Sequence, residues 1–236
     1  EPAMMAGGLV TVHCPRVPFA RWAAELLLIT DGESGSRACV VAASDAEIVP
    51  GRNLGGEPRD LVTVDGARPA AVSGPVEDLP AQLRRAGALA RAIQISAAIS
   101  QMLELTVRYC GQRQQFGRRL AQFQAVQQQL AVLAGEELAA RAAVQRALEL
   151  IGPGRWRAAP VAVAKARTAL AATTAAKIAH QLHGAIGITT EYPLSRLTRP
   201  AWAWREEYGS ERYWSGVLAR ESGTELWEAL TCPTTW

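Results

Sequence analysis

The first third of the chain alternates short runs of β-branched and aliphatic residues with stretches rich in glycine and proline. Runs of this length, bounded by turn-forming residues, are typical of β-strands. We expect strands at 9–13, 25–30, 38–42 and 60–64, with a hairpin turn at 31–36. Residues 1–78 are therefore predicted to form a small β-domain.

From residue 79 onwards the pattern is helical, and the region is rich in Ala, Leu, Gln, Arg and Glu. An amphipathic helix is predicted where apolar residues recur every three or four positions, at Phe123, Val126, Leu130, Leu133 and Leu138. Helices are expected near 79–111, 119–151, 156–183, 193–207 and 211–229. Long helices with short breaks predict an antiparallel bundle over 79–231, before a tail at 232–236. The fold class is therefore α+β, with a small β-domain followed by a C-terminal helical bundle.

Charge and cysteine content exclude several classes of function. The net charge is +3 without a dense Lys or Arg patch, so no nucleic-acid partner is expected. Cys14, Cys39, Cys110 and Cys232 form no C-x-x-C pair and have no histidine at zinc-ligand spacing, which predicts reduced cytoplasmic thiols and no metal. No apolar run reaches the ~20 residues that span a bilayer. The start at Glu1-Pro2 predicts a fragment or a missing front end.

The first motif that suggests chemistry is Arg113-Gln-Gln-Phe-Gly117, between two expected helices. An arginine at such a corner can form paired hydrogen bonds to a phosphate. An exposed phenylalanine can cover the edge of an aromatic ring, and a glycine permits a sharp turn. Taken alone, Arg113 would be a surface arginine near a helix end, but its spacing from Tyr109, Leu120 and Gln124 favours a binding site.

The second motif is Gln181-Leu-His-Gly-Ala-Ile-Gly187. A glycine after the last helical turn is also the common stop signal of a helix. Within this motif we expect His183 to be a structural hydrogen bonder, because a lone histidine at a helix end is more often structural than catalytic.

Together the two motifs resemble the flavin-contacting signatures of acyl-CoA dehydrogenases, and the resemblance continues through Glu191-Tyr-Pro193 and 201–209. It implies that FAD is the cofactor and that both motifs serve the FAD of a neighbouring subunit. Arg113 would bind the pyrophosphate, and the segment around Gln181 would hold the adenosine end. The cofactor-binding residues implied are Arg113, Gln115, Phe116, Gln124, Gln181, Gly184 and Ala185. The family's N-terminal helical domain is absent from the sequence, and Glu1-Pro2 would match the start of its β-domain.

The chain departs from the family where catalysis is concerned. The glutamate that takes the substrate's α-proton in most members corresponds to Tyr208 here, and a phenol with a pKa near ~10 is a poor base at neutral pH. The alternative base position of isovaleryl-type members corresponds to about Gly87. The β-domain also lacks the Trp-x-Thr segment that packs on the flavin ring, since the nearest stretch is 15–19. Trp22 lies close to this stretch, but a buried structural role is at least as well favoured for it as a contact with the flavin.

The resemblance therefore implies a subunit with no catalytic residue of its own. We expect an α₂β₂ heterotetramer, in which a homologous subunit supplies the base for α,β-dehydrogenation of an acyl-CoA, as in actinobacterial enzymes acting on sterol side-chain CoA thioesters. Electrons would pass to an electron-transfer flavoprotein. Two alternatives remain open: an active homo-oligomer with a displaced base at Glu206, Glu207 or Glu211, and a flavin-free structural or regulatory homologue.

The aromatic residues near the C-terminus have two interpretations. Trp202 and Trp204 alternate on an expected helix and cannot share one face. Together with Tyr208, Tyr213 and Trp214 they are predicted to pack the last helices into the bundle, with a subunit interface as the alternative.

Overall fold

The computed structural model describes residues 3–31, 35–152 and 157–222. It divides into two compact units, Glu1–Leu83 and Arg84–Trp236, each described here by itself. The boundary lies just after the one expected at 78/79. The predictions for Glu1-Pro2, the centre of the 31–36 turn, the helix beyond residue 222 and the tail at 232–236 fall outside the described residues.

The first unit is built from antiparallel strands in two sheets. One sheet has the order β1-β2-β6-β5, formed by β1 (Met4–Ala6), β2 (Leu9–Pro18), β6 (Arg59–Ala67) and β5 (Ala46–Val49). The other has the order β3-β4-β7, formed by β3 (Glu25–Thr30), β4 (Arg37–Ala42) and β7 (Ala71–Val72). The four predicted strands are confirmed. The sequence pattern missed β1, β5 and β7, which are too short to show alternation.

Alternation explains how the two sheets share one core. Val10 and Val12 on β2 and Val62 and Val64 on β6 point inward, and each is at most 5% exposed. They belong to the same buried cluster as Val41 on β4 of the other sheet. Because side chains alternate between the faces of a strand, the intervening residues face outward.

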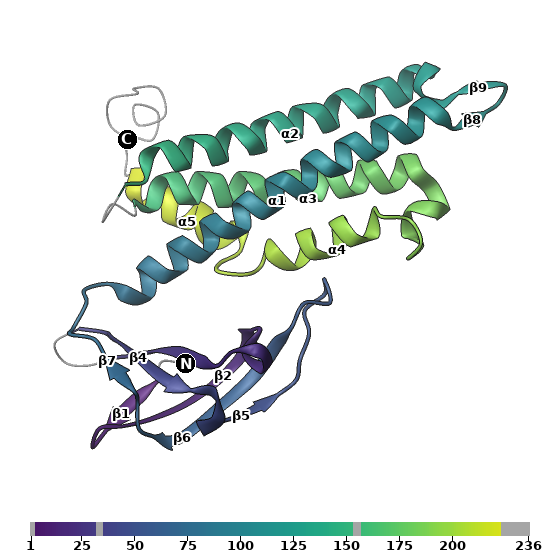
Figure 1. Ribbon diagram of the computed structural model, residues 1–236. Helices are drawn as coiled ribbons and strands as arrows, with labels where there is room; N and C mark the ends of the chain where they lie inside the picture. Colours follow the sequence, from purple (N-terminus) through teal and green to yellow (C-terminus); the bar gives the residue numbers. More distant parts are fainter. Residues whose placement is uncertain (1–2, 32–34, 153–156, 223–236) are drawn as a thin grey trace. The chain divides into compact units, whose positions relative to one another are not determined.

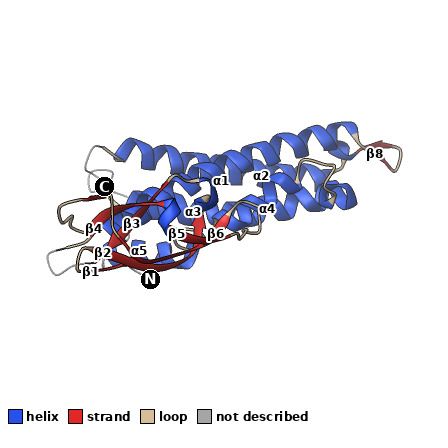
Figure 2. Ribbon diagram, turned by 60° about the horizontal axis from the view of Figure 1, so that its bottom comes forward, coloured by secondary structure: helices blue, strands red, loops and turns tan. Residues whose placement is uncertain are grey.

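The second unit is a helical bundle (Figures 1 and 2). Its long helices are α1 (Leu79–Gln112), α2 (Gln124–Leu150) and α3 (Ala158–His183), followed by α4 (Ser195–Trp204) and α5 (Glu211–Ser222). The predicted start of the second helix near 119 was wrong. Residues 114–119 instead form a hairpin of β8 (Gln114–Gln115) and β9 (Arg118–Arg119), and Leu120–Gln122 form a 3₁₀ turn.

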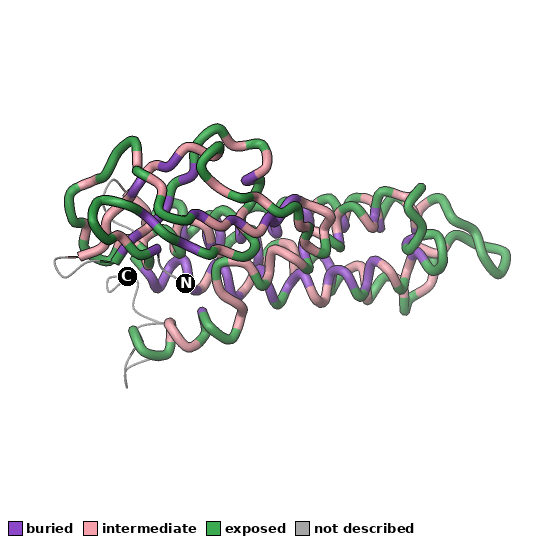
Figure 3. Tube along the Cα trace, turned by 90° about the horizontal axis from the view of Figure 1, so that it is seen from below, coloured by how far each residue is buried: buried purple, intermediate pink, exposed green. Residues whose placement is uncertain are grey.

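Figure 3 shows how buried residues (purple) recur along the helices of this unit. Helix α3 is buried along most of its length. Its inward positions are mostly alanines, which let neighbouring helices approach closely. The main cluster joins Ile99, Leu133, Ala175 and Ala201 from four helices. Of the predicted apolar stripe on α2, Leu133 is fully buried but Leu138 is 58% exposed; the buried face continues instead through Ala140, Val144 and Ala147.

No helix among the described residues combines the length and apolar character that crossing a bilayer requires. Cys14, Cys39 and Cys110 are free thiols, as expected, and Cys232 lies outside the described ranges.

Candidate functional site

The first motif forms the hairpin that projects from one end of the bundle (Figure 1). Helix α1 ends where the Arg113 amide donates to the Tyr109 carbonyl at 2.8 Å, and the Leu120 amide closes the corner by donating to Arg113 O at 2.9 Å. Phe116 and Gly117 occupy the turn with φ values of 52° and 80°. Two consecutive residues with positive φ are the requirement of a tight two-residue hairpin turn, which explains the glycine.

The side chains of this corner face outward. Arg113, Gln115 and Gln124 are exposed, and Phe116 is 90% exposed at the tip. Among the described residues the Arg113 guanidinium has no ion-pair partner. The Phe116 ring meets Phe123 edge-on with centroids 6.2 Å apart. The corner therefore offers a free guanidinium and an uncovered aromatic ring, which suit a phosphate joined to an aromatic group.

The second motif ends helix α3 at His183, and Gly184 follows with φ 64°. Residues Gly184–Ile188 continue as a 3₁₀ turn, with Gln181, Gly184 and Ala185 exposed. Gly187 is buried, and the site requires glycine because a Cβ atom there would lie 2.9 Å from His183 Cβ. This motif therefore presents a polar side chain and backbone groups at the surface.

A partly buried aromatic cluster, with His183 at its buried centre, joins the two motifs. The Tyr109 hydroxyl donates to the His183 carbonyl at 3.3 Å, and the two rings stack with centroids 4.5 Å apart. His183 Nδ1 donates to Ala179 O at 2.7 Å, so Nε2 accepts from the Tyr192 hydroxyl at 3.1 Å. Burial lowers the pKa of His183. His183 is thus a structural hydrogen bonder, as predicted, and the Arg113 corner lies at the same end of the bundle as the 181–187 segment.

The positions where the resemblance places a catalytic base also come together. Along one face of α1, Arg84 donates to the Tyr213 hydroxyl at 2.9 Å and Arg91 pairs with Glu207 at 2.7 Å. Between them, the Tyr208 ring lies directly against Gly87. A Cβ atom on Gly87 would be 2.3 Å from Tyr208 Cδ1 and 2.6 Å from Cγ. Glycine and a phenol therefore fill both positions, in mutual contact.

The neighbouring carboxylates are engaged elsewhere. Glu207 forms the ion pair with Arg91, in which both side chains are less than a fifth exposed. The Glu206 side chain is 63% exposed and lies 3.5 Å from the Arg205 guanidinium. Glu211 begins helix α5, where an acidic residue is favourable to the helix dipole.

Lys165 supports the segment that carries Tyr208, and the sequence analysis did not give it a role. It is fully buried on α3, and its Nζ donates to the carbonyls of Trp204, Arg205 and Gly209 at 3.1, 2.8 and 3.0 Å. Burial lowers its pKa to about 8, while nearby Glu206 and Glu207 oppose this shift. The signal available in the sequence was a lysine, Lys165, within an alanine-rich stretch of the helix.

The C-terminal aromatic residues divide between packing and exposure. Trp214 is 2% exposed in a cluster with α1, α2 and α3, which confirms the predicted packing of the last helix. Trp204 packs against the main core, whereas Trp202 is 40% exposed under the Arg205 guanidinium. As predicted, Trp202 and Trp204 do not share a face.

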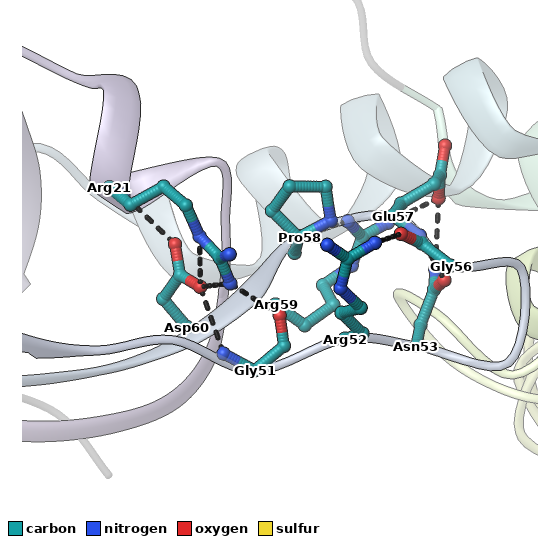
Figure 4. Close-up of polar contacts among 9 residues, drawn as sticks. All are labelled: Arg21, Gly51, Arg52, Asn53, Gly56, Glu57, Pro58, Arg59 and Asp60. Atoms are coloured by element: carbon teal, nitrogen blue, oxygen red, sulfur yellow. Dashed lines mark hydrogen bonds and ion pairs between the residues drawn. The ribbon is translucent and has the colours of Figure 1, made fainter.

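In the β-unit, Trp22 is 71% exposed, so the buried role considered for it is wrong for this chain. Its ring stacks on Phe19, with centroids 5.8 Å apart. The turn between them is fixed by Arg21, which forms an ion pair with the fully buried Asp60 and donates to the Gly51 carbonyl at 2.6 Å (Figure 4). The Arg21 guanidinium lowers the pKa of Asp60 strongly.

A second polar network stiffens the adjoining loop between β5 and β6 (Figure 4). Asn53 binds Glu57 through its side-chain amide at 2.9 Å and accepts from the Glu57 amide at 3.0 Å. Glu57 also pairs with Arg59 at 2.9 Å. Among the described residues no group of three or more His, Cys, Asp or Glu is placed to hold a metal.

Comparison with known proteins agrees with this architecture. Among solved structures, the ChsE4-ChsE5 complex from Mycobacterium tuberculosis covers 98% of the chain with a TM-score of 0.80 and 24% identity, and 63% of that chain is covered. The Tcur3481-Tcur3483 steroid ACAD G363A variant covers 92% of the chain with a TM-score of 0.82 and 27% identity, and 60% of that chain is covered. The predicted fold is therefore confirmed.

Sequence comparison identifies the family. The acyl-CoA dehydrogenase IpdE2 of Mycobacterium tuberculosis (strain ATCC 25618 / H37Rv) is 32% identical over 80% of the chain, which spans 58% of that protein. The chain spans about a third of the length of other curated relatives. The family profile described as acyl-CoA dehydrogenase, C-terminal domain, matches residues 84–222, more than half of the chain. The chain therefore belongs to the acyl-CoA dehydrogenase family.

Proposed function

We propose that the chain is the non-catalytic subunit of a heteromeric FAD-dependent acyl-CoA dehydrogenase. The observation that carries this proposal is the contact between Tyr208 and Gly87, which fills both expected base positions without a carboxylate. The partner subunit would supply the glutamate that removes the α-proton of the acyl-CoA. This chain would supply contacts to the partner's FAD.

The exposed corner fits the part of FAD that such a subunit would contact. Arg113 would bind the pyrophosphate, because its guanidinium is exposed and presents a planar fork of donors. Phe116 would cover the edge of a ring, and Gln115 and Gln124 would line the cofactor. Gln181, Gly184 and Ala185, at the same end of the bundle, would hold the adenosine end. When bound, FAD supplies the acceptor for the β-hydride.

The names of similar proteins support a substrate class. The names ChsE4-ChsE5 and Tcur3481-Tcur3483 each join two proteins, and the second is named a steroid ACAD. We therefore propose a bulky sterol side-chain CoA thioester as substrate, a heterotetramer with two copies of each subunit, and an electron-transfer flavoprotein as the acceptor of the electrons.

The test is the FAD content of the chain, purified alone and co-expressed with a homologous partner. We expect no flavin in the lone chain and about one FAD for every two chains in the complex. Arg113→Ala should weaken FAD retention about 10- to 100-fold, since a charge-assisted hydrogen bond contributes about 1.5–3 kcal/mol. The matched control is Arg146→Ala, which removes an exposed arginine paired with Glu149 on α2.

Two outcomes would contradict the proposal. One FAD per lone chain, with turnover that Glu207→Gln abolishes, would indicate an active enzyme with a displaced base. A colourless complex whose properties do not depend on Arg113 would indicate a flavin-free homologue.

A further inference from the structure

The end of helix α4 is held by an unusual cap. Carbonyls at a helix C-terminus have no partner within the helix, and solvent or a glycine turn usually satisfies them. Here the ammonium of Lys165 reaches across from α3 and donates to three carbonyls, those of Trp204, Arg205 and Gly209. An ammonium group has three donors, so all of them are used. Its positive charge also lies at the negative end of the α4 dipole.

The three carbonyls flank Tyr208 on both sides in sequence. Tyr208 itself adopts a left-handed conformation with φ 56°, which is costly for a residue other than glycine. Its carbonyl accepts a hydrogen bond from Trp214 Nε1 at 3.0 Å, and the Trp214 ring is buried. Lys165 and Trp214 thus fix the backbone on either side of the residue and at the residue itself.

This backbone conformation directs the Tyr208 ring onto α1. The ring meets the helix at Gly87, the one position of this face where the helix has no side chain. Arg84 and Arg91, one turn before and one turn after it, contact Tyr213 and Glu207. Tyr208 is 40% exposed, so its contact with Gly87 leaves it partly open to solvent, and the fixed backbone contributes to holding the ring in place.

We propose that Lys165 is a positioning residue that holds the Tyr208 ring against Gly87, where the ring keeps the acyl group of a CoA thioester off this chain's own α1. The inference rests on the proposed function, since it explains how a subunit without a base also avoids binding substrate unproductively. It adds a residue, Lys165, to which neither motif nor family position assigns a role.

The electrostatic surroundings of Lys165 are balanced. Arg91 faces it from α1, and Arg205, Glu206 and Glu207 face it from the segment after α4. Two positive and two negative groups leave the carbonyls as the main stabilisation of the ammonium. Because burial lowers the pKa of Lys165 to about 8, mildly alkaline solution should remove one of the donors and loosen the cap.

The position of the ring can be read with a single label, Tyr208→4-fluorophenylalanine, which keeps the ring and replaces the hydroxyl by fluorine. Lys165→Met removes the three donors at similar volume. The ¹⁹F signal should then move towards the position of a solvent-exposed ring, while the far-ultraviolet circular dichroism shows that the helices are kept. Lys177→Met is the matched control, since Lys177 is exposed on the same helix.

Two outcomes of this experiment would overturn the positioning role. In the first, the ¹⁹F signal of Lys165→Met does not move. In the second, the variant loses structure as a whole on melting and its ¹⁹F signal does not shift at any temperature below that transition. If Lys165→Met does not fold, the labelled chain with Lys165 intact gives the answer, because its signal should shift between pH 7 and pH 9. An unshifted signal over this range would equally overturn the role.

Exclusion of the acyl group is tested in the complex with the partner. We expect Tyr208→Ala to raise the octanoyl-CoA bound per complex in equilibrium dialysis, whereas Tyr213→Ala, which removes the neighbouring ring, should not. Unchanged binding in Tyr208→Ala would refute the exclusion. FAD content is measured on the same samples and reports on the proposed function separately, because neither tyrosine belongs to the cofactor corner.

Discussion

Replacing Gly87 by alanine should have an effect whose sign depends on Tyr208. Gly87 lies well inside helix α1, where a glycine costs about 1 kcal/mol relative to alanine. Without a neighbour, Gly87→Ala would therefore stabilise the helix. In this structure the new methyl group would lie 2.3 Å from Tyr208 Cδ1, far inside van der Waals contact.

The magnitude follows from these two opposing effects. Overpacking a tight contact costs about 1–3 kcal/mol, and here the ring cannot withdraw freely because Lys165 and Trp214 hold its backbone. The net effect of Gly87→Ala should therefore lie between no gain and a loss of about 2 kcal/mol. In the Tyr208→Ala background the methyl group meets no ring, so the same change should add up to about 1 kcal/mol. The coupling energy of the cycle should then equal the cost of the overpacked contact, about 1–3 kcal/mol.

Urea unfolding followed by helical circular dichroism measures all four corners of this cycle. Gly135→Ala is the matched control, because Gly135 lies inside α2 with open space around it and should stabilise both backgrounds equally. If Gly87→Ala stabilises the chain with Tyr208 present as much as Gly135→Ala does, the contact does not exist in solution and the argument built on it fails.

Three further predictions concern buried charges. Because the pKa of Lys165 falls from 10.5 to about 8 in the folded chain, the unfolded chain binds more protons between these values, so stability should rise with pH across this window by up to about 3 kcal/mol. Lys165→Met should lack this rise, as a difference between urea titrations at pH 7.5 and 10 would show. Brief acetylation of the folded chain should modify Lys177 and spare Lys165, as measured by peptide mass spectrometry; equal labelling would contradict the burial of Lys165. Asp60 has a lowered pKa, so its pairing with Arg21 stabilises the fold above the ordinary carboxyl pKa and is lost as pH falls below it. Asp60→Asn should therefore weaken the acid dependence of unfolding, whereas Asp65→Asn, at an exposed position, should not.

The sequence predicted those parts of the fold that depend on local pattern. Alternating valines identified β2 and β6, and the long alanine- and leucine-rich stretches identified the helices, because periodicity reports directly on which face is buried. The hairpin at 114–119 was missed although Gly117 marks a turn, since two-residue strands show no alternation.

The contacts of the candidate site could not be predicted from the sequence. The motif residues Arg113 and Gln181 were named from the resemblance to the family, and their contact with FAD stays a prediction. The contact of Tyr208 with Gly87, and the cap formed by Lys165, join segments far apart in the chain. The exposure of Trp22 likewise depends on the Arg21–Asp60 pair, which no local pattern indicates.

Helix α3 carries two residues, Lys165 and His183, that support different parts of the molecule. Lys165, near its start, holds the closed position at Tyr208, and His183, at its end, anchors the cofactor corner. These residues lie eighteen positions apart on a continuous helix, which at 1.5 Å per residue corresponds to roughly 27 Å. The helix thus sets a fixed distance between the exposed Arg113 corner and the position on α1 that Tyr208 fills. On the proposed function, FAD bound at the Arg113 corner would therefore react at the partner's centre, about a helix length away from the position that Tyr208 fills.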